Sequence, residues 1–433
     1  MFATLKNAFK VKEIRTKLLI TLALLLLFRI GSWLPIPGID VTVFQNMVTG
    51  AGKDFLSLLS GLSGGALANG AFVALGVSPY ITASIIIQLL TVAIPALEKL
   101  SKMGEEGKKK LNKYTRFTAL FLAIAQSIGI VASFGSTSIN ATLFGANAPL
   151  WTAQVFVIAV LVAGAMFTYW LGEKISEVGI GNGLSLLIFV GILSTAGTSL
   201  LASFTSAFTN NLDALWEILI FIGALVLIFG LIVFIDLSER KVPIQYAKQV
   251  RGRKMYGGQS THIPIRVNGS GVLPIIFAMS FLAFPQLLMS IFWPTSSFYN
   301  WYSIYLGAGT WIYSVLAGLL ILLFAMMYSQ LSFNPVDVSK HIQQNGGFVP
   351  GIRPGKPTSD YLSKISKRIT LFGALFLAFI AIVPTLIFKA IGSGGLIGAF
   401  SATGMLIVVS VALEFNKGLE TQLLMKNYKG FLK

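Results

Sequence analysis

The chain has 433 residues, of which 55% are hydrophobic and only 11% are Asp, Glu, Lys or Arg, yet its net charge is +17. A soluble domain carries about 25% charged residues, so this composition excludes an ordinary soluble protein, and basic residues scattered between apolar runs disfavour nucleic-acid binding. The absence of cysteine excludes disulfides, thiolate metal sites and cysteine nucleophiles, and two histidines are too few for a histidine-based metal centre.

Ten apolar stretches are long enough to cross a bilayer core of about 30 Å, which takes roughly 20 helical residues. We expect spans at 17–35, 70–97, 116–134, 150–171, 183–204, 214–236, 270–292, 309–331, 369–389 and 396–413. Pro79 lies in the second stretch and predicts a kink there. The first stretch follows a basic opening but lacks a small-residue cleavage site, so we interpret it as a retained span and not as a signal peptide.

The basic residues fall on one side of these spans. With both termini inside, 30 of the 33 Lys and Arg residues lie in inside segments, and the exceptions are Arg29, Lys53 and Lys389. The positive-inside rule therefore predicts cytosolic termini in a cell membrane. We expect Arg29 to extend to the outer headgroups. Five spans in each half predict that the halves 1–205 and 206–433 are inverted relative to each other, as in many transporters.

A short apolar segment, residues 55–67, precedes the second span and is too rich in glycine to form a continuous helix. Non-helical backbone at membrane depth persists only inside the protein or along a water-filled cavity. We therefore interpret the segment as a re-entrant half-helix in a cavity on the outer side. An amphipathic surface loop is the alternative.

Two inside connections, 237–268 and 332–368, each exceed 30 residues and concentrate Lys, Arg, Gln, Pro and Gly. One interpretation is a solvated basic collar that attracts anionic lipid headgroups. The other is a docking surface for a protein partner. Aromatic residues such as Tyr246, Tyr256 and Phe348 favour docking, because attraction to lipid needs no aromatic side chains.

Sequence signals for catalysis and ion coupling are missing. The chain has no Walker-type phosphate loop, no His-Glu-x-x-His and no Gly-x-Ser-x-Gly, so we expect no nucleotide site, no cofactor and no enzyme. No span carries an Asp, Glu or His at mid-depth, which disfavours a proton- or sodium-driven carrier. The glycines of 179–183 follow no strand, so they predict a glycine-eased start of the fifth span.

Five motifs, in the same order over nearly the whole chain, resemble those of the bacterial SecY family of protein-conducting channels. They are 28–40 (FRIGSWLPIPGID), 79–88 (PYITASIIIQ), 179–183 (GIGNG), 246–248 with 259–262 (YAK and QSTH) and 348–355 (FVPGIRPG). The resemblance implies an all-α polytopic membrane protein, with ten helices in two clamshell halves around an hourglass pore. It also implies that a plug is formed by Phe55, Leu56, Leu58, Leu59, Gly61, Leu62, Gly64, Gly65 and Leu67.

The resemblance assigns further roles by position. A ring of aliphatic side chains at the pore waist is implied for Ile81, Ile85, Ile188, Ile192, Ile276 and Ile407. Without the family, packing or lipid contact is the simpler role for these six. A polar cluster in a lateral gate between spans two and seven is implied for Thr91, Gln126 and Asn268, although Gln126 equally fits ordinary helix packing. Docking of SecA or the ribosome is expected at Arg251, Arg253, Lys254 and Arg353.

The predicted function is that of the central channel subunit of the Sec translocase, a passive pore that exports unfolded polypeptides and releases transmembrane segments sideways into lipid. Because the chain has no nucleotide site, a partner must supply the energy. The resemblance names SecA and the ribosome as cytosolic partners, SecE and SecG as membrane subunits, and a signal peptide and unfolded preprotein as substrates. The alternative is a secondary transporter of a small solute, which needs a polar midplane site that the sequence barely offers.

Overall fold

The computed structural model describes residues 2–42, 45, 60–61, 63–134, 149–210, 214–246, 249–251, 254–256, 260–269, 271–292, 296–307, 310–391 and 402–431. The chain divides into two compact units. Unit 1 comprises Met1–Ile218, Ser280–Tyr313 and Ile391–Lys433, and unit 2 comprises Leu219–Met279 and Ser314–Ala390. These units differ from the predicted inverted halves, 1–205 and 206–433, which stay a prediction.

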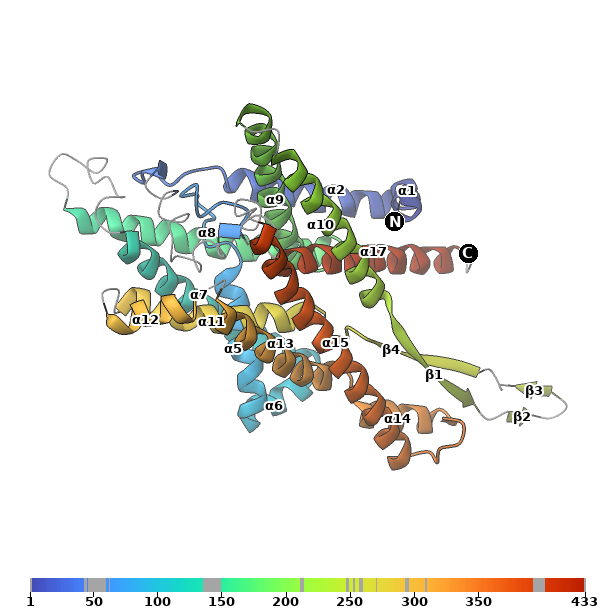
Figure 1. Cartoon of the computed structure of the whole chain (residues 1–433). Helices are drawn as coiled ribbons and strands as arrows, with labels where there is room; N and C mark the ends of the chain where they lie inside the picture. Colours follow the sequence, from blue (N-terminus) through green and yellow to red (C-terminus); the bar gives the residue numbers. More distant parts are fainter. Residues whose placement is uncertain are drawn as a thin grey trace. The chain divides into compact units, whose positions relative to one another are not determined.

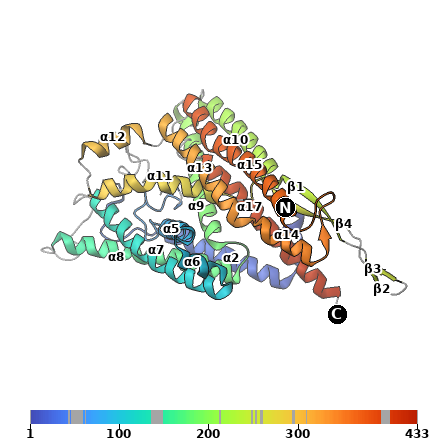
Figure 2. The ribbon, with the colours of Figure 1, turned by 90° about the horizontal axis from the view of Figure 1, so that it is seen from below.

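Unit 1 is mostly helical in its described residues, with turns between α2 and α5. Its helices are α1 (Phe2–Lys10), α2 (Lys12–Gly31), α5 (Ser78–Ala93), α6 (Pro95–Lys102), α7 (Glu105–Phe134), α8 (Leu150–Val178), α9 (Gly183–Asn210), α12 (Ser297–Tyr305) and α17 (Ala402–Phe431). In sequence order, α5, α7, α8 and α9 each pack against the next. Figure 2 shows α6, which follows α5 in the chain, alongside α7.

The second predicted span differs from the expectation in where its helix starts and stops. Residues 70–77 form buried turns, and α5 begins only at Ser78, with Pro79 in its first turn and so without a kink. The break comes later, at Ile94, where the extended backbone before Pro95 turns the chain by 102° into α6. Proline disfavours helical backbone in the residue before it, which explains the break. The apolar run 70–77 is buried in the protein and is not part of a membrane-spanning helix.

The junction of α8 and α9 confirms the glycine-eased start of the fifth span. The Asn182 Oδ1 accepts hydrogen bonds from the backbone N–H groups of Leu184 (3.1 Å) and Ser185 (3.4 Å), which caps α9. A Cβ atom on Gly183 would lie 2.0 Å from the carbonyl oxygen of Gly172 in α8. Only glycine therefore allows the two helices to pack this closely.

The two ends of the described chain pack against each other in unit 1 (Figure 1). Thr4 in α1 donates a hydrogen bond of 3.3 Å to Glu420 in α17. A small apolar cluster joins Ile14 and Leu18 of α2 to Leu419 of α17. The amphipathic N-terminal helix is thus fixed to the polar second half of α17.

Unit 2 combines helices with two small antiparallel sheets. Its elements are α10 (Ala214–Leu237), β1 (Glu239–Tyr246), β2 (Gln249–Arg251), β3 (Lys254–Tyr256), β4 (Ser260–Arg266), α11 (Leu273–Phe292, which continues into unit 1), α13 (Trp311–Ser332), α14 (Pro335–Gln344), β5 (Gly347–Phe348) and α15 (Lys356–Ile391). The strand order of the larger sheet is β4-β1-β5. The all-α expectation missed these strands, which pair the two long inside connections with each other.

Six helices of the described residues are long and apolar enough to cross a membrane, or seven if α5 and α6 form one bent span. The helices α2 and α17, in which an apolar stretch is combined with charged residues, are not among them. In α11, the run that qualifies as apolar is the shorter Leu273–Leu282. The described residues therefore show six or seven of the ten expected spans by length and composition.

Candidate functional site

Two backbone hydrogen bonds join the chain just after α2 to the chain just before α5. The backbone N–H of Ile36 donates to the carbonyl of Gly70 at 2.9 Å, and that of Phe72 donates to the carbonyl of Leu34 at 2.9 Å. A Cβ atom on Gly164 of α8 would lie 1.8 Å from the Phe72 carbonyl oxygen. Backbone pairing thus joins the residues on either side of 37–69, and Phe72 packs tightly on α8.

The described end of the predicted plug contacts both α2 and α9. The Arg29 guanidinium donates a hydrogen bond of 2.8 Å to the carbonyl of Gly64. Gly64 has a φ of +72°, and a Cβ there would lie 2.9 Å from the Cα of Gly191 in α9. One turn further along α9, Thr195 donates to the carbonyls of Gly61 (3.5 Å) and Gly191 (3.2 Å). The segment therefore lies against α9 at backbone distance.

Arg29 has contacts within the protein that the sequence interpretation did not predict. It also donates to Ser32 Oγ at 3.1 Å, and its guanidinium carbon lies 5.3 Å from the ring centre of Trp33. Its expected extension to the outer headgroups stays a prediction beside these contacts. A single arginine inside an apolar span was the available signal, because an intramembrane charge takes a protein partner more often than not.

The predicted plug residues fall into two groups. Phe55, Leu56, Leu58, Leu59 and Leu62 lie outside the described residues, whereas Gly61, Gly64, Gly65 and Leu67 are described. Leu67 is fully buried, in a cluster with residues of α7 and α8 such as Ile130 and Leu161. The C-terminal end of the segment is therefore part of the core of unit 1.

The six isoleucines of the predicted ring lie on four helices. Ile85, Ile188, Ile192 and Ile407 are buried, and Ile81 and Ile276 are half-buried. Those of α9 and α17 are on helices that pack against each other in unit 1. Ile276 lies in the part of α11 that belongs to unit 2. Gly191, the contact of the plug segment, directly precedes Ile192.

The three predicted gate residues have different surroundings. Thr91 in α5 donates to the carbonyl of Gln88, three residues before it, at 2.6 Å. Asn268 donates to the Asp236 carboxylate at 2.8 Å. Gln126 in α7 is buried, and its Oε1 has no hydrogen-bond partner in the part of the chain that the structure describes. The buried Gln88 Oε1 is likewise unpaired, and the sequence interpretation did not single it out.

Two of the three predicted docking residues of the first inside connection, Arg251 and Lys254, lie at the tip of a β-hairpin. The strands β1 and β4 pair from Glu239 opposite Arg266 to Gln245 opposite Ser260, and β2 and β3 lie at the far end (Figure 1). Arg251 is opposite Lys254 in the β2–β3 pair. Arg253 lies outside the described residues.

Arg353, the docking residue of the second connection, is exposed on a backbone that several contacts fix. Its carbonyl accepts a hydrogen bond of 2.7 Å from Thr358 Oγ1. Gly351 and Gly355 have φ values of 81° and 99°, which glycine adopts without strain. Ser339 in α14 donates to the carbonyl of Gly355 at 2.8 Å. The side chain of Arg353 is thus presented to solvent from a closely held turn.

A sequence model of the SecY family matches residues 71–416. The chain belongs to the SecY family. It is 41% identical over 443 residues to the protein translocase subunit SecY of Streptomyces galbus, with both chains covered in full. The SecY subunits of Streptomyces coelicolor and Mycobacterium bovis are 41% and 38% identical, also over their full lengths.

Solved structures of protein-conducting channels have the same fold as this SecY-family chain. A structure of a protein-conducting channel has a TM-score of 0.63 at 19% identity and covers 94% of this chain and 91% of its own. A study of how the SecY plug domain stabilises the closed channel provides another, with a TM-score of 0.62 at 19% identity and the same coverage. The expected ten helices fit this fold.

Together these findings establish the coarse function. The chain is a multi-pass membrane protein and a channel subunit of the Sec translocase, and it is not an enzyme. The rival interpretation, a secondary transporter of a small solute, has no support in these relatives.

Proposed function

We propose that this channel subunit is a passive pore that moves unfolded polypeptides outward and releases apolar segments sideways into lipid. The observation that carries the proposal is the backbone contact between Gly64 and Gly191. It joins the described end of the predicted plug to the helix that carries Ile188 and Ile192, which are predicted to form part of the constriction. Because the plug segment lies against the helix of the constriction, displacement of the plug can open the constriction.

The predicted ring of six isoleucines is the constriction in this proposal. Ile188 and Ile192 are four residues apart and therefore share one face of α9. A hydrophobic constriction resists wetting and ion passage, and it accommodates side chains of any kind in an extended substrate. Ile407 on α17, which packs on α9, is buried as this role requires.

Lateral release is proposed to use the polar cluster of Thr91, Gln126 and Asn268. The unpaired Oε1 of Gln126 supports this, because a buried amide oxygen without a partner destabilises the packing that surrounds it. Polar contacts between membrane helices contribute only about 0.6 kcal/mol on average, which suits a gate that must open. A signal peptide entering there gains about 25 cal/mol for each Å² of apolar surface transferred to lipid.

Energy for export is proposed to come from partners at the inside connections. The solved channel of a canine ribosome-channel complex, with a TM-score of 0.60, supports the ribosome as one of them. SecA is proposed as the motor, SecE and SecG as membrane subunits, and Arg251, Arg253, Lys254 and Arg353 as docking residues. We place both termini in the cytosol of a cell membrane, where anionic lipids face the basic side.

The proposal is tested with the full chain reconstituted with SecE and supplied with SecA, ATP and a signal-bearing preprotein. We expect Arg353→Glu to reduce SecA-driven uptake at least about tenfold, because a charge-reversed docking contact loses its hydrogen bonds and becomes repulsive. The matched control is Lys356→Glu, which changes an exposed residue at the start of α15 and should reduce uptake less than twofold. Equal losses in the two variants would show that the loops act only as a basic collar.

The same proteoliposomes test the conducting function itself. Uptake must depend on SecA and on the signal peptide, and a signal-deleted preprotein is the control. If the chain with SecE and SecA takes up no preprotein under any condition, the export function proposed here is wrong.

A further inference from the structure

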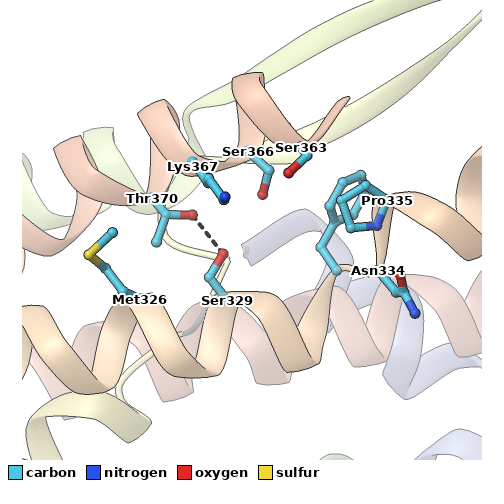
Figure 3. A pocket seen from close by; sticks show the side chains of 9 residues that line it. Met326, Ser329, Asn334, Pro335, Ser363, Ser366, Lys367 and Thr370 are labelled. Carbon is cyan, nitrogen blue, oxygen red and sulfur yellow. Dashed lines mark hydrogen bonds between the residues drawn. The ribbon is translucent and has the colours of Figure 1, made fainter. Parts of the chain in front are cut away.

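A cavity of about 340 Å³ lies within unit 2 between the last turns of α13, the start of α14 and the first half of α15 (Figure 3). Its α15 wall is made by Ser363, Ser366, Lys367 and Thr370. This spacing of three, four and seven residues places all four side chains on one helix face. The volume is at the lower end of the range of roughly 300–1,000 Å³ typical of small-ligand sites.

The polar groups of this wall are not used by the fold. Ser363 and Ser366 make no hydrogen bond within the described chain, although Ser366 is only 9% exposed. Several other helical hydroxyls of this protein donate to the carbonyl four residues before them, as Ser127 does to Ala123 at 2.7 Å. The two serine hydroxyls are therefore free to donate to a molecule in the cavity.

The opposite wall adds further donor capacity. Thr370 Oγ1 and Ser329 Oγ of α13 are 2.6 Å apart and share one hydrogen bond. Because one of these hydroxyls donates to the other, the second keeps a free hydrogen atom. Figure 3 shows the Lys367 nitrogen near the Ser366, Thr370 and Ser329 oxygens, in the space between the two helices.

The charge of the cavity is positive. Lys367 lines it, and none of the nine residues that line it is Asp or Glu. An exposed ammonium group that lines a cavity together with hydroxyl donors matches an anion with several acceptor oxygens, above all a phosphate group.

The depth of the cavity distinguishes a lipid phosphate from a free one. The helix α13 runs over 22 residues from Trp311 to Ser332 and is one of the helices long and apolar enough to cross a membrane. At 1.5 Å per residue it is about 33 Å long, slightly more than a hydrocarbon core of about 30 Å, so Ser329 in its last turn lies near one end of the span. Met326, one turn deeper, lines the membrane side of the cavity, whereas Asn334 lines its cytosolic side. Phospholipid phosphates occupy this level of a bilayer.

We propose that this cavity binds the phosphodiester headgroup of an anionic phospholipid on the cytosolic side. In this assignment Lys367 pairs with the phosphate, and Ser363 and Ser366 donate hydrogen bonds to its oxygens. The acyl chains leave past Met326 into the bilayer. The site is discrete, in contrast to diffuse attraction by the basic collar, and it does not depend on the proposed route of the polypeptide.

The test counts the phospholipid molecules that the full chain retains in detergent, by native mass spectrometry over a titration with phosphatidylglycerol. We expect Lys367→Gln and Ser366→Ala each to weaken the tightest phosphatidylglycerol site about tenfold, since each removes a direct contact to the phosphate. The matched control is Lys364→Gln, an exposed residue of the same helix that does not line the cavity. It should change this affinity less than twofold. Circular dichroism and thermal unfolding without lipid verify that the variants are folded.

Two further arms identify the source of the phosphate. Phosphatidylcholine should bind the parent weakly and the Lys367→Gln variant equally weakly. Inorganic phosphate at about 10 mM should not displace phosphatidylglycerol. Equal losses in Lys367→Gln and Lys364→Gln overturn the proposal in favour of a collar, and displacement by inorganic phosphate overturns the assignment to a lipid.

Discussion

The contact of Gly64 with α9 predicts that a single methyl group releases the plug segment. In Gly64→Ala the new Cβ would lie 2.9 Å from the Cα and 3.2 Å from the carbonyl oxygen of Gly191, and 3.0 Å from the Arg29 guanidinium. Since two of these atoms are backbone, the segment must move away from α9. The neighbouring Gly65 is a matched control, because its φ is also positive, at +82°, but nothing lies within 4 Å of its Cβ position.

The two variants share every cost except the overlap. Alanine in the left-handed region costs about 1–2 kcal/mol at either position. Overpacking against backbone adds about 1–3 kcal/mol at Gly64 alone. Since about 1.4 kcal/mol is a factor of ten, the undocked fraction of the segment should be roughly 5- to 150-fold higher in Gly64→Ala than in Gly65→Ala.

The assay is the resting ion conductance of the full chain in planar bilayers, with export of a preprotein that has a defective signal peptide as a second measurement. We expect both to rise in Gly64→Ala and to stay near the parent value in Gly65→Ala. Deletion of residues 57–65 sets the upper limit, because it removes the predicted seal without removing a span. If the deletion leaks and the two alanine variants are indistinguishable, the contact with α9 does not hold the plug closed. A deletion as tight as the parent refutes the plug itself.

Two other substitutions have matched controls in the structure. Gly183→Ala places a methyl group 2.0 Å from a carbonyl oxygen of α8 and should lower the free energy of unfolding in detergent by about 3 kcal/mol or more. Gly197→Ala, in open space on the same helix, should raise this free energy by up to about 1 kcal/mol. Similar melting temperatures for the two variants would contradict the packing described for α8 and α9. Ile407→Asn puts a hydrogen-bonding group at a buried position of the predicted ring and should speed export of preproteins with defective signal peptides, whereas Leu26→Asn, at a side chain 63% exposed on α2, should affect only insertion or stability. The same export phenotype at both positions would remove Ile407 from the constriction.

The sequence by itself determined the class of protein, because burial in lipid requires long apolar segments whatever their tertiary arrangement. The spans of α7, α8, α9, α10, α13 and α15 were predicted within several residues at their apolar ends. The glycines of 179–183 were correctly placed at a helix start. Five motifs of matching order were specific enough to identify the family, since long ordered matches do not arise by chance.

Hydropathy failed where apolar residues are buried in protein instead of lipid. Residues 70–77 are as apolar as a span, but they form turns packed on α8. The same failure placed the kink at Pro79, which lies in the first turn of α5, where a missing N–H costs nothing. The composition of a segment indicates only whether it prefers an apolar environment. The path of its backbone depends on which groups accept its hydrogen bonds.

Only the tertiary structure decided how polar groups are used. The partner of Arg29 is a backbone carbonyl 35 residues away, and nothing in the sequence near either residue indicates the pairing. The cavity beside Lys367 needs α13 and α15 to meet at one depth, although its serine spacing on α15 is visible in the sequence. The strands β1 and β5 pair because two inside connections lie together. These contacts are directional and join residues far apart in the sequence. A periodic pattern along one helix indicates only which face the helix buries, so it does not predict them.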